Sequence, residues 1–256
     1  MSVPPLAAPA PTPAAPFAID ASRWYYRYGY VGAAHWLARY HRTRVRGTPA
    51  DPPCIYLAHH GAGYLVLDLV VAAYEVAWRR WYARRGPATP LRIVGARGNA
   101  MERAIPGLGA AKRQAGMIDP TETAAIAVLE RGEPLLITPG GRREATPAAR
   151  DYRLRWRDRY GFVRIALHTG APIVPLAVVG GFEAFPGFAR GKLSFWSPLP
   201  LPVRLDVVIG EPIAVPRSPE RARDAAVVVP LHERAWRATQ ALYDTVLAER
   251  RRPSQR

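Results

Sequence analysis

Short apolar runs of strand length alternate with helix-like segments along most of this 256-residue chain. Four of the apolar runs are predicted to be buried strands, at residues 54–59, 91–96, 134–138 and 173–179. Helices are predicted at residues 64–84, 121–131, 160–169 and 231–250, and further strands at 192–196 and 203–209. Strands separated by helices imply one α/β domain, with helices on both faces of a central mixed, mostly parallel sheet.

The two ends of the chain differ in composition from the body between them. The first sixteen residues hold six prolines, five alanines and no charge, so residues 1–19 are predicted to form a disordered tail. Residues 20–250 are predicted to form the domain, and residues 251–256 a basic tail. The start lacks a secretory signal pattern, and no apolar run approaches the roughly 18–20 residues that span a bilayer. We therefore expect an intracellular protein.

Arginine dominates the charge of the chain. Thirty-six lysines and arginines against twenty aspartates and glutamates give a formal net charge of +16. This balance favours anionic partners, which are phosphates, phospholipid headgroups or nucleic acid. The single cysteine, Cys54, excludes an internal disulfide and any all-cysteine metal site.

Two adjacent histidines, His59 and His60, end the first apolar strand and precede a Gly-Ala-Gly elbow. Open α/β sheets bind ligands at such strand ends. Asp68, in the helix that follows, can fold back toward a histidine, hold one ring nitrogen protonated and leave the other as a base. Ordinary strand-end histidines and a solvated helix carboxylate are the alternative.

A second motif, Pro-Gly-Gly-Arg-Arg-Glu at residues 139–144, follows the strand at 134–138. Glycines let backbone N–H groups approach a substrate closely, and arginine binds phosphate or carboxylate through paired hydrogen bonds. Further along, Pro172 and Pro175 restrict the start of the strand at 173–179 and can shape one wall of a cleft. An ordinary turn and an ordinary entry strand remain the alternatives.

Taken in order, these motifs resemble the glycerolipid acyltransferase superfamily, in the branch close to diacylglycerol acyltransferases and their membrane-associated relatives. The resemblance covers roughly residues 54–215 and rests on His60-Gly61, Ile105-Pro106-Gly107-Leu108, Gly116, Leu129-Glu130-Arg131-Gly132, residues 139–144, Tyr160-Gly161-Phe162, Ala171-Pro172-Ile173-Val174-Pro175 and Gly210-Glu211-Pro212-Ile213. The family places four residues, or slightly more in this branch, between its catalytic histidine and aspartate. Seven separate His60 from Asp68 here, which implies either a longer elbow or an altered dyad.

The resemblance implies acyl transfer from a thioester to a hydroxyl of a glycerolipid or other lipid alcohol. His60, the histidine followed by glycine, would be the general base, and Asp68 would orient its ring. Backbone N–H groups of Gly140 and Gly141 are the expected oxyanion donors.

Substrate contacts are also implied by the resemblance. Arg143 would hold an anionic group of the donor or acceptor, and Glu144 would position that arginine. The other residues expected to bind substrate are Gly61, Pro139 and Pro175. The donor would be an acyl-CoA or an acyl carrier protein thioester, acting as co-substrate, and neither a metal nor another cofactor is expected.

Residues 23–46 interleave aromatic side chains with arginines, and residues 78–85 repeat the pattern. Both side-chain types suit a bilayer interface. We expect a helix at residues 20–46 that attaches the protein peripherally to membrane lipids, at an anionic bilayer surface on the cytoplasmic face. The alternative is that the aromatic rings pack in the core and the arginines point into water.

Three other functions fit parts of the sequence. A catalytically inactive, lipid-binding relative would retain the motifs. A basic nucleic-acid-binding protein would explain the net charge, but no helix-turn-helix, zinc-finger or aromatic RNA-binding signature is present, so we expect no nucleic acid partner. None of the six serines lies in a Gly-x-Ser-x-Gly motif, which disfavours a serine hydrolase.

Overall fold

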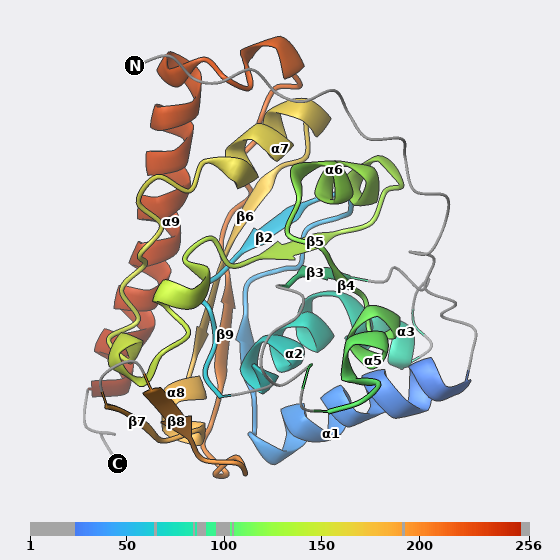
Figure 1. The fold of residues 1–256 in the computed structure, drawn as a ribbon, viewed down its shortest axis with the longest axis vertical. Coiled ribbons are helices and arrows are strands. Elements are labelled where there is room, and N and C mark those ends of the chain that lie inside the picture. Colours follow the sequence, from blue (N-terminus) through green and yellow to red (C-terminus); the bar gives the residue numbers. More distant parts are fainter. Residues whose placement is uncertain are drawn as a thin grey trace.

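Parallel strands from distant parts of the sequence form the centre of the molecule (Figure 1). The computed structural model describes residues 24–63, 66–83, 85, 91–95, 103, 105–190 and 193–251. The predicted tail at 1–19 lies outside this range, and so does the predicted tail at 251–256 except for Arg251, which ends the last helix. Its strands are β1 (Arg44–Arg46), β2 (Ile55–Leu57), β3 (Arg92–Val94), β4 (Met117–Ile118), β5 (Leu135–Ile137), β6 (Ile173–Val179), β7 (Gly187–Arg190), β8 (Leu193–Trp196) and β9 (Asp206–Ile209).

Seven strands form one sheet in the order β1-β9-β6-β2-β5-β3-β4. The five from β6 to β4 are parallel to one another, whereas β9 runs antiparallel to β6 and β1 runs parallel to β9. A separate antiparallel hairpin consists of β7 and β8. The predicted mixed, mostly parallel sheet is therefore confirmed.

Helices cover both faces of this sheet, as predicted (Figure 1). Strand residues alternate between the two faces. Ile55 and Leu57 of β2 point into one hydrophobic cluster, and Tyr56 points into the other. The first cluster contains residues of α6, α7 and α9, and the second contains residues of η1, α1, α2 and η2. The helices are η1 (Tyr25–Val31), α1 (Gly32–Tyr40), α2 (Leu67–Ala73), η2 (Tyr74–Trp78), α3 (Arg79–Tyr82), α5 (Leu108–Gln114), α6 (Glu122–Glu130), η3 (Gly141–Arg143), η4 (Pro147–Ala149), α7 (Gly161–Thr169), α8 (Gly181–Ala184), η5 (Pro219–Arg221) and α9 (Ala225–Arg251).

The N-terminal helix is shorter than predicted. It runs through η1 and α1 and ends at Tyr40, because Arg44–Arg46 leaves the helix to pair with β9. Its aromatic residues lie in two environments, because some of them, such as Trp24 and Trp36, are exposed to solvent and others are in the core. Tyr26 is buried and packs edge-on against the buried Trp78 at 6.4 Å between ring centroids. Trp78, the first residue of the second aromatic group, thus belongs to the core. The expectation that this group lies at a bilayer surface is wrong for Trp78.

The last helix and the hairpin extend beyond their predicted bounds. Helix α9 starts at Ala225, before Pro230, and the Asp224 carboxylate caps it by accepting a hydrogen bond from the Ala226 N–H at 2.9 Å. Only the β8 half of the hairpin was expected from the sequence. No helix among the described residues combines the length and the apolar character needed to cross a bilayer.

Candidate active site

The carboxyl ends of three adjacent parallel strands bring the predicted site residues together. Strand β2 lies between β5 and β6. His60 follows β2, the Gly140–Gly141 turn follows β5, and Gly181 follows β6. Ligands of open α/β sheets bind at this end of the strands, so the position predicted for the site agrees with the topology.

Three hydrogen bonds fix His60. Its backbone N–H donates to the Glu144 carboxylate at 2.9 Å, and its carbonyl oxygen lies 2.6 Å from Nδ1 of His59. Its own Nδ1 lies 3.1 Å from the carbonyl oxygen of Gly61. Because a carbonyl can only accept, Nδ1 carries the proton and Nε2 keeps its lone pair. Burial lowers the pKa of His60 below its ordinary value, so the ring is neutral near pH 7.

Asp68 is close to His60 along the chain but bonds to other groups. Its buried carboxylate accepts hydrogen bonds from the N–H groups of Ala62 at 3.1 Å and Leu69 at 3.0 Å. We expected it to reach a ring nitrogen of His60 directly or through one water. Among the described contacts it forms no direct hydrogen bond with His60, and its part in orienting that ring stays a prediction. Helix α2 begins only at Leu67, which places Asp68 in the first turn, facing the backbone of the elbow.

The packing around Asp68 explains two glycines. A Cβ atom on Gly61 or Gly181 would overlap the Asp68 carboxylate. This carboxylate therefore joins the elbow after β2 to the turn after β6. Burial raises its pKa to about 6.

Glu144 has a different role from the one expected. The side chain is fully buried, and its second oxygen accepts a hydrogen bond from the Arg155 N–H at 2.6 Å. Both carboxylate oxygens are thus used by backbone groups, so the expectation that Glu144 positions Arg143 is wrong. Burial raises the pKa of Glu144 to about 7. Arg143 instead points outward, 39 % exposed, with Nη1 3.5 Å from the Asp158 carboxylate.

The glycines of the turn after β5 and the two prolines were also predicted to contact the reacting groups or the substrate. Gly141 donates its N–H to the Thr138 carbonyl at 3.0 Å, whereas the N–H of Gly140 donates no hydrogen bond within the described chain. A single backbone donor, Gly140, therefore remains where two were expected. Pro139 is partly exposed beside it, but Pro175 is buried inside β6, where its carbonyl accepts a hydrogen bond from the Gly210 N–H at 2.8 Å. Pro175 cannot contact a substrate from that position.

An aromatic cluster around His59 was missed by sequence reasoning. The His59 ring lies 5.7–6.0 Å from the rings of Tyr152, Phe182 and Tyr243. Tyr243 Oη accepts hydrogen bonds from the N–H groups of His59 at 3.0 Å and Val178 at 3.2 Å. Burial lowers the pKa of His59 to about 3, and its Nε2 has no hydrogen-bond partner among the described residues. His59 is therefore a neutral core residue.

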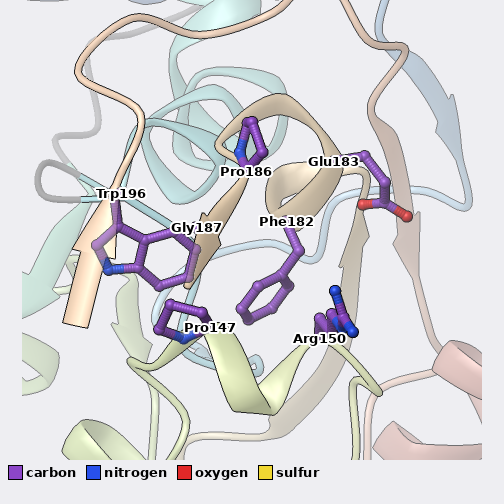
Figure 2. A pocket seen from close by; sticks show the side chains of 7 residues that line it. All are labelled: Pro147, Arg150, Phe182, Glu183, Pro186, Gly187 and Trp196. Carbon is purple, nitrogen blue, oxygen red and sulfur yellow. The ribbon is translucent and has the colours of Figure 1, made fainter. Parts of the chain in front are cut away.

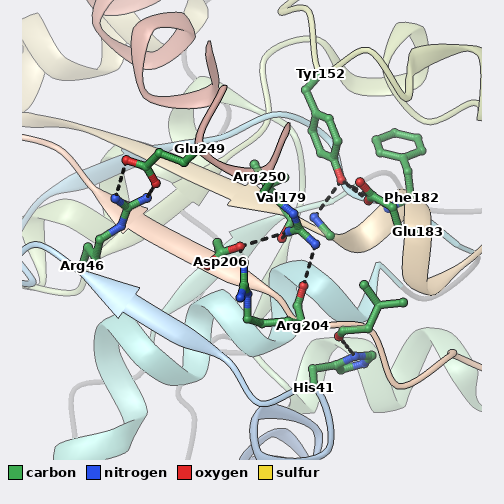
Figure 3. A network of polar contacts seen from close by, with 12 residues as sticks. His41, Arg46, Tyr152, Val179, Phe182, Glu183, Arg204, Asp206, Glu249 and Arg250 are labelled. Carbon is green, nitrogen blue, oxygen red and sulfur yellow. Dashed lines mark hydrogen bonds and ion pairs between the residues drawn. The ribbon is translucent and has the colours of Figure 1, made fainter. Parts of the chain in front are cut away.

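A pocket of about 280 Å³ lies next to this cluster (Figure 2). Its walls are formed by four apolar and two charged side chains, which are those of Pro147, Phe182, Pro186, Trp196, Arg150 and Glu183. The Tyr152 hydroxyl donates a hydrogen bond to the Glu183 carboxylate at 2.9 Å and accepts one from the Gly180 N–H at 2.8 Å (Figure 3). Among the described residues, no three His, Cys, Asp or Glu side chains gather as ligands for a metal.

Parts of the chain are similar in sequence to known proteins. A family model described as diacylglycerol acyltransferase matches residues 110–190, which include the turn after β5 but neither His60 nor Asp68. An uncharacterised protein of Mycobacterium tuberculosis is 30 % identical over 189 residues, covering 66 % of this chain and 50 % of that protein. The human "DGAT1/2-independent enzyme synthesizing storage lipids" is 30 % identical over 130 residues, covering 46 % of this chain and 38 % of that one. The chain thus spans half or less of the length of these relatives.

The fold also has a solved counterpart. The 1-acyl-sn-glycerophosphate acyltransferase PlsC of Thermotoga maritima matches with a TM-score of 0.52 over 90 % of this chain and 80 % of that chain, at 18 % identity.

Proposed function

Because the chain belongs to a glycerolipid acyltransferase-like family, we propose that it transfers a fatty acyl group from a thioester donor to a hydroxyl of a glycerolipid or other lipid alcohol. One observation carries this proposal. His60 stands at the carboxyl end of β2 with Nδ1 bound to the Gly61 carbonyl, which leaves Nε2 able to accept a proton.

In the proposed reaction Nε2 of His60 removes the proton of the acceptor hydroxyl as its oxygen attacks the thioester carbonyl. A tetrahedral oxyanion forms. When the carbon–sulfur bond breaks, the imidazolium returns the proton to the departing thiolate, and an ester and a free thiol remain. A general base of this kind contributes roughly 10²–10⁴-fold to the rate.

The groups around His60 then have separate roles. The Gly61 carbonyl orients the ring, and Asp68 is a positioning residue that holds the elbow carrying Gly61 and Ala62. The N–H of Gly140 is the proposed oxyanion donor. Arg143, exposed beside the same turn, is proposed to hold a phosphate or carboxylate of a substrate.

The apolar part of a lipid substrate is proposed to occupy the pocket at Phe182 and Trp196. Phe182 contacts the ring of His59, so the pocket lies one side chain away from the histidine pair. Four of its walls are apolar side chains, which suits a hydrocarbon chain. Beyond the acyl-CoA or acyl carrier protein thioester, the proposed reaction uses no cofactor.

We also propose that the protein works at the cytoplasmic face of a membrane, attached peripherally to an anionic bilayer. The exposed aromatic residues of the N-terminal helix support this, because Trp24 is 74 % and Trp36 is 60 % exposed. Exposed aromatic rings beside arginines favour the region between headgroups and acyl chains.

A lipid-binding relative without catalysis is the second candidate, because Asp68 forms no hydrogen bond with His60 in the part of the chain that the structure describes. The two are separated by incubating the purified chain with labelled acyl-CoA or acyl carrier protein and a panel of lysophosphatidic acid, monoacylglycerol and diacylglycerol. The proposal expects a labelled ester with at least one acceptor. Lipid binding without ester formation across the panel would favour the second candidate.

A further inference from the structure

Strand register brings four segments to the end of the sheet that carries the candidate site. Val179 at the carboxyl end of β6 pairs with Asp206, and Arg44 pairs with the same Asp206 from the other side. The segment before β9 and the C-terminal end of α1 therefore reach this end of the sheet. Helix α8 and the β7–β8 hairpin follow β6 there, and Figure 1 shows these segments together at the lower end of the molecule.

Large apolar side chains project from these segments into solvent. Phe188 and Phe195 are cross-strand partners in the hairpin, stacked at 5.0 Å between ring centroids, yet 63 % and 43 % exposed. In the segment after β8, Leu199 is 74 % and Leu201 is 47 % exposed. Trp36 of α1 is 60 % exposed. We call these five residues the apolar rim.

Side-chain contacts join Trp36 to the segment that carries the two leucines. Trp36 stacks on Tyr40 at 5.2 Å, and the Tyr40 hydroxyl donates to the carbonyl of Pro200 at 2.9 Å, between the two exposed leucines. The start of the hairpin adjoins the elbow, because a Cβ on Gly63 would lie 3.0 Å from the ring of the buried Phe185, two residues before β7.

Backbone hydrogen bonds hold the apolar rim in its exposed position. The Leu201 N–H donates to the Ala184 carbonyl at 2.8 Å, and the Ser197 N–H donates to the Pro186 carbonyl at 2.9 Å. At the base of the segment, Arg250 donates to the Arg204 carbonyl at 3.0 Å (Figure 3). These bonds tie the backbone to α8 and α9, and within the described part of the chain they leave the two leucines at the surface.

Arginines without acidic partners accompany these apolar groups. Arg39, Arg44 and Arg190 are exposed and form no ion pair within the described part of the chain. The Arg42 guanidinium only approaches the Pro202 carbonyl, at 3.4 Å. The face therefore combines an apolar centre with unneutralised positive charge.

We propose that the apolar rim is the face that docks on an anionic bilayer, with its phenylalanines and leucines among the acyl chains and these arginines among the headgroups. The inference rests on the proposed function in that the substrates are lipids, and it extends the contact region from the N-terminal helix to the β7–β8 hairpin and the segment after it. Two copies of the chain would bring like charges together on this face, which disfavours self-association. A nucleic acid, unlike a bilayer, offers no apolar medium for the two phenylalanine and two leucine side chains of the rim.

Vesicle binding by the full chain tests the proposal. Phosphatidylcholine vesicles with and without phosphatidylglycerol are compared for wild type, Phe188→Ser with Phe195→Ser, and Leu199→Ser with Leu201→Ser. Each double variant should lower the partition coefficient on anionic vesicles on the order of tenfold or more, with circular dichroism unchanged. The matched control is Ile105→Ser, which removes a side chain that is 48 % exposed before α5 and should bind as wild type does.

Charge is tested separately. Arg39→Gln with Arg190→Gln should weaken binding to anionic vesicles roughly tenfold and leave binding to neutral vesicles unchanged, and added salt should reduce the difference. Equal vesicle binding by wild type and both rim variants would overturn the proposal. So would rim variants that abolish a dimer in sedimentation velocity while retaining vesicle binding.

A soluble assay distinguishes failure of this inference from failure of the proposed function. Transfer between a short-chain acyl thioester and a water-soluble alcohol needs no bilayer, so the rim variants should retain it. Transfer by the wild type without rim-dependent vesicle binding would overturn the docking face and leave the enzyme proposal standing. Rim-dependent binding without any transfer would support the docking face and contradict the enzyme proposal.

Discussion

The carboxylate of Glu144 accepts a hydrogen bond from the backbone N–H of His60 across 2.9 Å. The two residues come from turns after different strands, β2 and β5. The same carboxylate holds the Arg155 N–H, so one buried acid joins three segments around the candidate base. In the proposed reaction, the position of His60 thus depends on Glu144 as well as on the elbow that Asp68 supports.

The glycine pair after β5 tests this dependence. A Cβ on Gly140 would overlap the Glu144 carboxyl group, whereas one on Gly141 meets nothing within 4 Å. Gly140→Ala should displace Glu144 and reduce kcat for acyl transfer by on the order of 10²-fold. Gly141→Ala, at a φ of +49°, is the matched control and should cost only about 1 kcal/mol of stability. Equal kcat values for the two variants would contradict the role given to Glu144.

The pH dependence of transfer should depend on Glu144. Its pKa, raised to about 7 by burial, implies that acidification protonates it and weakens its hold on the backbone of His60. The pKa of His60 is itself lowered, so the base protonates at more acidic pH. In wild type, kcat/KM should therefore fall as pH drops through about 7. In Glu144→Gln the fall should move below the ordinary histidine pKa of about 6.5, with a lower plateau. A pH profile unchanged by this substitution would exclude Glu144 from the titration.

Asp68 should make stability depend on pH in a defined direction. Burial raises its folded pKa to about 6 from 3.8, so between these values the folded chain holds a proton that the unfolded chain has lost. Its contribution is fully present below the unfolded pKa and is lost as pH rises through the folded one. Relative to Asp68→Asn, wild type should lose on the order of 3 kcal/mol of unfolding free energy between about pH 4 and pH 6. Urea unfolding at a series of pH values measures this, and parallel curves would show that the carboxylate is solvated.

Arg143 and Arg153 are both exposed arginines, ten residues apart in the sequence, and can be compared as a matched pair. Arg143 is exposed beside the Gly140 turn, and Arg153 is exposed farther along the chain. Arg143→Ala should raise KM for a phosphate-bearing substrate roughly tenfold, because a bidentate contact is lost. Arg153→Ala should leave KM unchanged. Steady-state kinetics in which both variants behave alike would argue against a specific anion contact.

The sequence was sufficient to predict the sheet and the location of the candidate site. Strand-length apolar runs and helical periods are local signals, and parallel strands necessarily share one carboxyl end. His60 and Gly140 were therefore expected together, and they are found together. Their catalytic roles stay predictions.

Side-chain partners were not predictable in the same way. The direction of Asp68 depends on where α2 starts, and Val66 precedes that start with a φ of +44° that no pattern signals. Glu144 looked like the partner of the adjacent Arg143, but the η3 turn directs it into the core. Tyr243, which holds the backbone of His59, lies 184 residues further along the chain. Contacts of this kind depend on tertiary packing, so periodicity does not reveal them.

Acyl transfer by His60→Ala and His59→Ala, measured beside wild type, shows whether His60 is the general base. His60 has an available Nε2 in the proposed site, whereas His59 is buried among aromatic rings. His60→Ala should lower kcat by roughly 10²–10⁴-fold with an unchanged Tm. His59→Ala should lower Tm, because it leaves a cavity, and should retain far more transfer. Wild-type kcat in a folded His60→Ala variant, or loss of transfer only in His59→Ala, would contradict the account.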